Sequence, residues 1–179
     1  MRKGIISLAV VFFVVTISSA SIAAEVYGIE IQEWGIYDIT RIEKAIEQKN
    51  LTPDTAVPVD DIKLLQLTYK IPARVGTSFG LKYYVNGHPT GAQVNITHRW
   101  LFPYPGVKHP DTGKLIHYYD ERILTPIGRT MQGNYLIVWS IAALQKFTEA
   151  SDLIPGEWKL QLWHGRKKLK EKTFTVYKP

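Results

Sequence analysis

Cysteine is absent from all 179 residues of the sequence. This absence excludes disulfide bonds, thiol nucleophiles and thiolate metal sites. It also excludes a cysteine beside an N-terminal leader, to which a lipid anchor could be attached. The fold must therefore depend on a packed core, and a chain of this length is large enough to form one.

Familiar catalytic patterns are missing as well. No Gly-x-Ser-x-Gly motif marks a nucleophilic serine, and no glycine-rich loop carries the lysine of a phosphate site. The neighbouring carboxylates of Asp120 and Glu121 would point to opposite faces of a strand, which does not suit a glycosidase pair. We expect no cofactor and favour a non-enzymatic protein, while the question of catalysis stays open.

The N-terminus carries the features of a secretion signal. Arg2 and Lys3 precede an apolar run over residues 5–15, and small residues follow. A cationic start, an apolar centre and a small-residue cleavage site together predict a cleavable signal peptide over residues 1–24.

Cleavage after Ala23 fits the small-x-small rule, and cleavage after Ala24 is the alternative. The remaining residues, 25–179, have the length of one domain. We expect this domain to be periplasmic or secreted, with no membrane anchor once the signal peptide is removed.

The charge of the chain is mildly positive. Its net charge is +6, and loss of Arg2 and Lys3 lowers this to +4 (6 − 2). Much of the excess lies within 164–172, which we interpret as a solvated hairpin whose lysines discourage edge pairing. The alternative is a contact with an acidic polymer or an anionic membrane. Nucleic acid is not an expected partner of an exported protein.

Alternating apolar and polar residues, with turn signals between short runs, predict an all-β domain. About seven or eight strands and no βαβ pattern indicate an antiparallel two-sheet sandwich of immunoglobulin-like architecture. A capping-box pattern makes a short helix over 41–49 reasonable. The conformations of 115–130 and 142–150 stay open.

The C-terminal hairpin allows a prediction about register. A two-residue loop at Gly165-Arg166 would pair even-numbered with odd-numbered residues, yet Trp158 and Phe174 both look like core residues. One extra residue in one strand restores the match. We therefore predict a β-bulge near 170–172.

Three segments together resemble a known bacterial family, the domain of unknown function 3859. They are Gly35-Ile36-Tyr37, Gly76-Thr77-Ser78-Phe79-Gly80, and the run from Leu153 through Trp163 to Val176. The resemblance implies a bacterial source and a β-rich domain but no activity. On physical grounds, Gly76 and Gly80 mark positions of positive φ or close packing, and Phe79 and Trp158 mark the core.

Aromatic residues supply the candidate binding sites. Trp163 lies five residues after Trp158 and should face the opposite side, beside Lys168 and Lys170. Tyr118 and Tyr119 are further candidates, which we expect in a loop of the middle region. Exposed rings of this kind can stack on sugars or anchor a protein partner.

The candidate metal ligands are His109, Asp111 and His117. They lie around one predicted loop, although their spacing matches no strong metal motif. Ordinary solvent-exposed histidines are the alternative interpretation.

These observations favour an exported binding or interaction module of the bacterial cell envelope. Its partner would be another envelope protein or a glycan. The alternatives are a hydrolase of envelope polymers and a carrier of a small ligand or metal.

Overall fold

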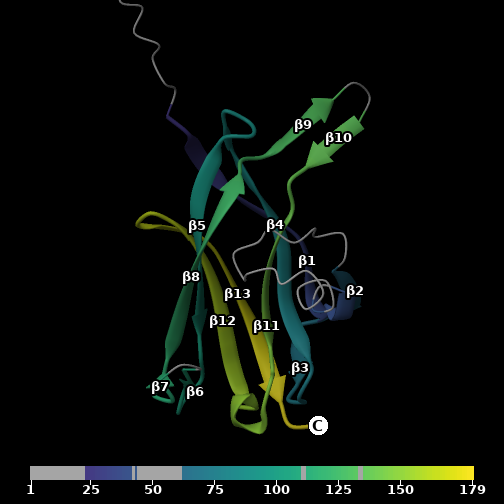
Figure 1. Ribbon diagram of the computed structural model, residues 1–179, viewed down its shortest axis with the longest axis vertical. Coiled ribbons are helices and arrows are strands. Elements are labelled where there is room, and N and C mark those ends of the chain that lie inside the picture. Colours follow the sequence, from purple (N-terminus) through teal and green to yellow (C-terminus); the bar gives the residue numbers. More distant parts are fainter. Residues whose placement is uncertain (1–22, 42, 44–61, 110–111, 133–134) are drawn as a thin grey trace, which may run out of the picture.

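The computed structural model describes residues 23–41, 43, 62–109, 112–132 and 135–179, and over 129–132 and 135–138 only the backbone. Its strands, labelled in Figure 1, are β1 (Glu25–Asp38), β2 (Lys63–Leu67), β3 (Lys70–Pro72), β4 (Ser78–His88), β5 (Gln93–Leu101), β6 (Val107–Lys108), β7 (Leu115–Ile116), β8 (Tyr118–Pro126), β9 (Arg129–Gln132), β10 (Tyr135–Val138), β11 (Ile141–Lys146), β12 (Gly156–His164) and β13 (Lys167–Tyr177). One 3-10 turn, η2 (Ala150–Asp152), precedes β12.

The strands form two main sheets, which confirms the predicted all-β sandwich. One sheet has the order β11-β4-β1-β2, and the other has the order β3-β13-β12-β5-β8. Neighbours in both are antiparallel, except that β3 runs parallel to β13. In Figure 1 the β9–β10 hairpin extends away from the two sheets, whereas β6 and β7 lie near one end.

The strand count differs from the predicted seven or eight, because thirteen strands lie within the described residues. The additional strands are short, with three residues in β3 and two each in β6 and β7. Runs of this length show no measurable alternation in a sequence. The structure also gives the conformation of the two regions that the sequence left undecided. Residues 115–130 contain β7 and β8, and residues 142–150 contain most of β11.

The helix predicted over 41–49 falls almost entirely outside the described residues. Thr40, Arg41 and Glu43 have helical conformation. The Glu43 N–H donates to the Ile39 carbonyl at 3.1 Å, as in the first turn of a helix.

Strands β4 and β5 follow one another in the chain but do not pair as a hairpin, although residues 86–91 are rich in turn-forming types. Asn86 and Gly87 continue β4 and pair with Gly28 and Val26 of β1. The chain then crosses to the other sheet, where β5 pairs with β8 and β12. Turn chemistry shows that a chain reverses, but it does not show which sheet the next strand joins.

The core between the sheets is an aromatic cluster centred on Phe79 of β4. The Phe79 ring lies 5.2–5.8 Å, centroid to centroid, from four other rings. These belong to Trp100, Phe147, Trp158 and Phe174. All five side chains are buried, so the predictions that Phe79 and Trp158 are core residues are confirmed.

The predicted bulge of the C-terminal hairpin is confirmed in kind and lies one residue earlier than expected. His164 pairs with Lys167 and Trp163 with Lys168, but Leu162 pairs with Lys170. Leu169 is therefore the extra residue. Beyond it, Trp158 pairs with Phe174, and both side chains face the core.

Two glycines allow neighbouring strands to approach closely. Gly35 of β1 pairs with Gly80 of β4, and both have positive φ, 139° and 154°. A Cβ atom on Gly80 would lie 2.0 Å from the Ala143 carbonyl oxygen of β11. Gly76 also has positive φ, at 88°, so the two glycines of the predicted strand start are confirmed as special positions.

Substitution Gly80→Ala should destabilise the fold by about 2–4 kcal/mol, through backbone strain and lost hydrogen bonds between β4 and β11. Urea unfolding monitored by circular dichroism measures the change. The matched control is Gly28→Ala in β1, because a Cβ atom there would have no neighbour within 4 Å. Equal stability losses in the two variants would contradict the prediction.

Candidate functional site

The outer face of the five-stranded sheet brings aromatic and charged side chains together. Because side chains alternate along a strand, the residues between core positions point away from the other sheet. We call the resulting surface the Arg99 platform. It consists of Arg99 from β5, Tyr118 and Asp120 from β8, Gln161 and Trp163 from β12, and Lys168 and Glu171 from β13.

Arg99 is the centre of this platform. Its guanidinium carbon lies 5.1 Å from the centroid of the Tyr118 ring and 5.6 Å from that of the Trp163 ring. Both contacts are within the range of a cation–π interaction. The same guanidinium donates two hydrogen bonds to the Asp120 carboxylate, at 2.7 and 2.6 Å. Arg99 therefore orients two rings and one carboxylate at once.

The paired charges also alter the acidity of both groups. The hydrogen bonds from Arg99 hold the pKa of Asp120 below its usual value, against a smaller effect of burial. The same contacts raise the pKa of Arg99. Both groups therefore stay charged at neutral pH, and the bidentate geometry is preserved.

A second hydrogen-bond network continues the platform across β12 and β13. The Trp163 indole N–H donates to Gln161 Oε1 at 3.0 Å, and Gln161 Nε2 donates to Glu171 at 2.7 Å. Lys168 donates to the same Glu171 oxygen at 2.8 Å. The polar groups around Trp163 are thus held in fixed positions.

The structure brings together three of the five binding candidates identified in the sequence. Trp163, Tyr118 and Lys168 belong to the platform, and Trp163 is on the opposite face from Trp158, as predicted. Trp163 is half-buried rather than fully exposed, because Arg99 lies against it.

The other two candidates point away from the platform. Tyr119 pairs with the core residue Trp100 and so lies on the other face of its strand, although it is exposed. Lys170 pairs with the core residue Leu162 and is likewise on the inner side of the register. Tyr118 and Tyr119 lie in strand β8, which corrects the expectation of a loop; alternation was hidden there by charged residues at an exposed sheet edge.

Arg99 was not a candidate in the sequence, although it organises the platform. Its odd-numbered position among the alternating residues of 93–101 indicates an outward side chain. The missing information was that β5 lies between β8 and β12, which only the sheet order supplies.

The proposed metal ligands lie only partly within the described residues. Asp111 lies outside the described residues, whereas His109 and His117 lie within them. Across those residues no group of three or more metal-binding side chains is present. A metal site at His109, Asp111 and His117 stays a prediction.

A different group of polar side chains lies inside the sandwich. His98 of β5 is 1% exposed, and its Nε2 is 2.7 Å from the Tyr83 hydroxyl of β4. Its Nδ1 is 3.6 Å from the carboxylate of Glu121, a side chain that is 51% exposed. That distance exceeds a hydrogen bond but is within ion-pair range. Burial of His98 and Tyr83 leaves little access for a substrate, so we assign these two residues a structural role.

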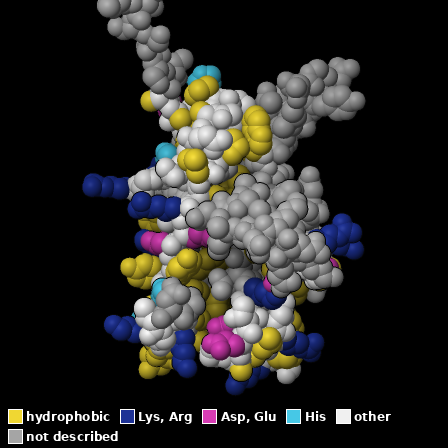
Figure 2. Space-filling view, in the orientation of Figure 1, with side chains coloured by type: hydrophobic (Ala, Val, Ile, Leu, Met, Phe, Trp, Pro, Cys, Tyr) yellow, Lys and Arg dark blue, Asp and Glu magenta, His cyan; other side chains and the backbone are white. Residues whose placement is uncertain are grey.

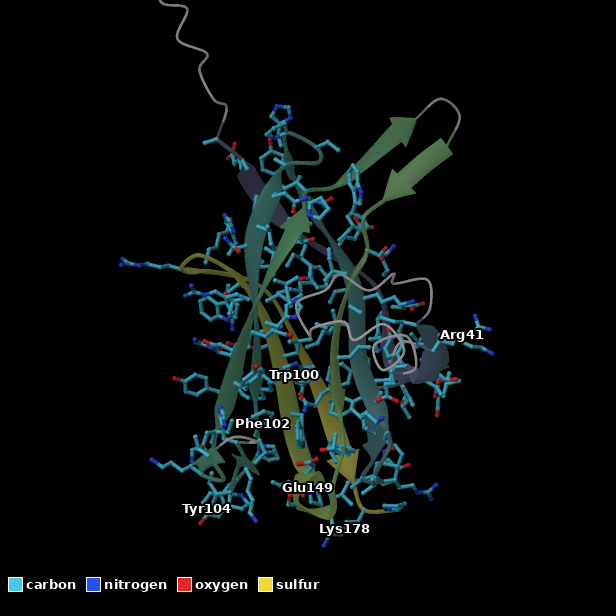
Figure 3. The ribbon with its side chains drawn as sticks, in the orientation of Figure 1. Arg41, Trp100, Phe102, Tyr104, Glu149 and Lys178 are labelled. Carbon is cyan, nitrogen blue, oxygen red and sulfur yellow. The ribbon has the colours of Figure 1, made fainter. Side chains whose placement is uncertain are left out.

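Figures 2 and 3 show how exposed side chains are distributed. In Figure 2, Lys and Arg side chains project from the left margin with acidic and hydrophobic side chains between them, so no single basic patch forms there. Figure 3 shows Tyr104 at the lower end of the molecule, near β6 and β7, and it is 88% exposed.

None of the helices within the described residues is long and apolar enough to cross a membrane.

Comparisons with known proteins agree with the fold. The family model for the domain of unknown function (DUF3859) matches residues 25–176. The structure is similar to the crystal structure of an immunoglobulin-like protein from Pseudomonas aeruginosa, with a TM-score of 0.56 and 25% identity. That match covers 89% of this chain and 100% of the other. No curated protein matches the sequence.

The contact between His98 and Glu121 leads to a pH prediction. His98 lowers the pKa of Glu121 relative to the ordinary value of 4.5, against an opposing effect of burial. A lowered folded-state pKa adds stability above the unfolded-state value, and this stability is lost as the pH falls through the folded-state value. Substitution Glu121→Gln should therefore flatten the decline of unfolding free energy below pH 4.5.

The expected difference is at most about 1 kcal/mol, because the Glu121 side chain is half-exposed and water screens its charge. Urea unfolding between pH 6 and pH 3 measures it. The same substitution in a His98→Gln background should have little further effect. An unchanged pH dependence in Glu121→Gln alone would contradict the prediction.

Proposed function

This chain belongs to the family of the domain of unknown function DUF3859, and on that premise we propose a non-enzymatic binding module of the bacterial cell envelope. The Arg99 platform is the proposed contact surface. The observation that carries this proposal is the gathering of Trp163, Arg99 and Tyr118 on one outer sheet face, with their polar neighbours hydrogen-bonded around them.

Aromatic rings and arginine are the residue types that dominate the energetics of protein contact surfaces. Here they are held by neighbouring side chains before any partner arrives, which lowers the entropy cost of binding. Tyr118 is 57% exposed, so its ring remains available to a partner.

The arrangement of ionisable groups supports binding over catalysis. A hydrolase needs histidine and carboxylate side chains that converge where a substrate can reach them. His98 and Glu121 bring a histidine and a carboxylate together, yet His98 is buried. The carboxylates of the platform are instead occupied by Arg99 and Lys168.

Export is part of the same proposal. It is supported by the cationic, apolar and small-residue parts of the segment 1–24. Both β1 and the match to the family model begin at Glu25, directly after that segment. Removal of residues 1–24 would therefore leave all the described strands intact, although Ala24 packs against the core.

Sequencing the N-terminus of the protein recovered from the periplasm or the medium should give Ala24 or Glu25 as the first residue. Mass spectrometry of the intact protein supplies an independent measurement of the same cut. A protein that still begins at Met1 would contradict the predicted cleavage.

Immobilised protein should retain a component of the solubilised cell envelope, and the double variant Trp163→Ala/Tyr118→Ala should lose most of it. Each substitution removes the contact area of one aromatic ring from the centre of the platform. The matched control is Tyr27→Ala. Tyr27 is about as exposed as Tyr118, but it belongs to β1 of the other sheet. If the unmodified protein, the double variant and the control retained the envelope component equally, the platform would be refuted as the contact surface.

A further inference from the structure

We infer that the Arg99 platform binds an uncharged glycan chain. This inference rests on the proposed binding function and names the class of ligand. It follows from four features of the platform: its rings, its polar side chains, its balance of charge and its width.

The rings and polar side chains match the two kinds of surface that a sugar offers. A pyranose ring presents C–H groups on its faces, which pack on aromatic rings, and hydroxyl groups around its edge. Trp163 and Tyr118 supply the aromatic surfaces. Asp120 and Gln161 lie next to them and offer acceptors and donors to hydroxyl groups.

The polar groups of the platform already have hydrogen-bond partners, but they can form further hydrogen bonds. Each oxygen of the Asp120 carboxylate accepts one hydrogen bond from Arg99. A carboxylate can accept about four, so capacity remains for hydroxyl donors. The ion pair thus fixes the direction of these acceptors while leaving them able to bind.

Six charged groups of the outer sheet face form three ion pairs, and exposed Arg122 adds one further cation near Asp120. This near balance of charge disfavours a strongly charged ligand. Arg99 is paired with Asp120 at 2.6 Å, Lys168 with Glu171 at 2.8 Å, and Lys159 with Glu157 at 3.3 Å. An anionic polymer or membrane surface would have to compete with these carboxylates for each cation. A neutral polyol can bind without breaking any of the three pairs.

The width of the platform suits a chain rather than a single sugar. Its residues come from four adjacent strands, β8, β5, β12 and β13. Neighbouring strands are about 4.8 Å apart, so the three gaps span roughly 14 Å. This is enough for more than one sugar residue, with Tyr118 towards one side and Lys168 towards the other.

The test uses the purified mature protein and two sets of probes. Oligomers of N-acetylglucosamine and of glucose are the neutral glycans, and poly-glutamate is the anionic polymer. Isothermal titration calorimetry at low and high salt gives the affinity for each. We expect binding of at least one neutral oligomer, stronger for longer chains and insensitive to salt.

Variants then locate the site. Trp163→Ala and Tyr118→Ala should each weaken glycan binding by about tenfold or more, as expected for central aromatic contacts. Tyr118→Phe keeps the ring and should bind much more strongly than Tyr118→Ala. Tyr27→Ala is the control on the other sheet and should bind like the unmodified protein. Circular dichroism confirms that each variant is folded.

The outcomes separate this inference from the proposed function. Binding of poly-glutamate alone, or no binding of any probe while an envelope protein is still retained through Trp163 and Tyr118, would overturn the glycan inference and keep the binding module. Glycan binding that is unaffected by either alanine variant would overturn the platform as the site. Absence of both glycan binding and platform-dependent retention would overturn both proposals.

Discussion

The two sheets pack together around a central cluster of aromatic rings within a larger apolar core, and the chain has no cysteine to link them. Phe79 of β4 meets Trp100, Trp158 and Phe174, which come from three neighbouring strands of the opposite sheet. Burial of each such side chain contributes about 1.5–3 kcal/mol, so a few rings supply much of the attraction between the sheets. The close approach of β11 to β4 at Gly80 then places Phe147 against the same ring.

The core also determines what lies outside. Since successive side chains point to opposite faces, the burial of Trp100, Trp158 and Phe174 leaves Arg99, Trp163 and Glu171 on the outer face. The bulge at Leu169 allows both arrangements, because without it β13 would turn either Phe174 or Lys168 to the wrong side. The Arg99 platform is therefore a consequence of the same register that builds the core.

Local patterns predicted this architecture well, and relations between distant segments were not predictable. The hairpin bulge follows from residues 158–176 alone, since two facing strands with a fixed loop leave little choice of register. The passage of the chain from β4 to β5 across the sheets has no local signal. For the same reason Trp163 and Tyr118 could be selected individually from the sequence, whereas Arg99, which joins them through β5, could not.

Two clusters of cations and aromatic rings in this structure differ in what they hold together. Lys172 of β13 lies over the stacked rings of Trp34 and Tyr69 and donates to the Tyr69 hydroxyl at 2.8 Å. That cluster joins β13 of one sheet to β1 of the other, so its stabilising role is evident. The Arg99 platform joins β8, β5, β12 and β13, which the backbone already pairs within one sheet. Its contacts are not needed to hold the sheets together, and this is the physical reason for proposing the platform as a binding surface.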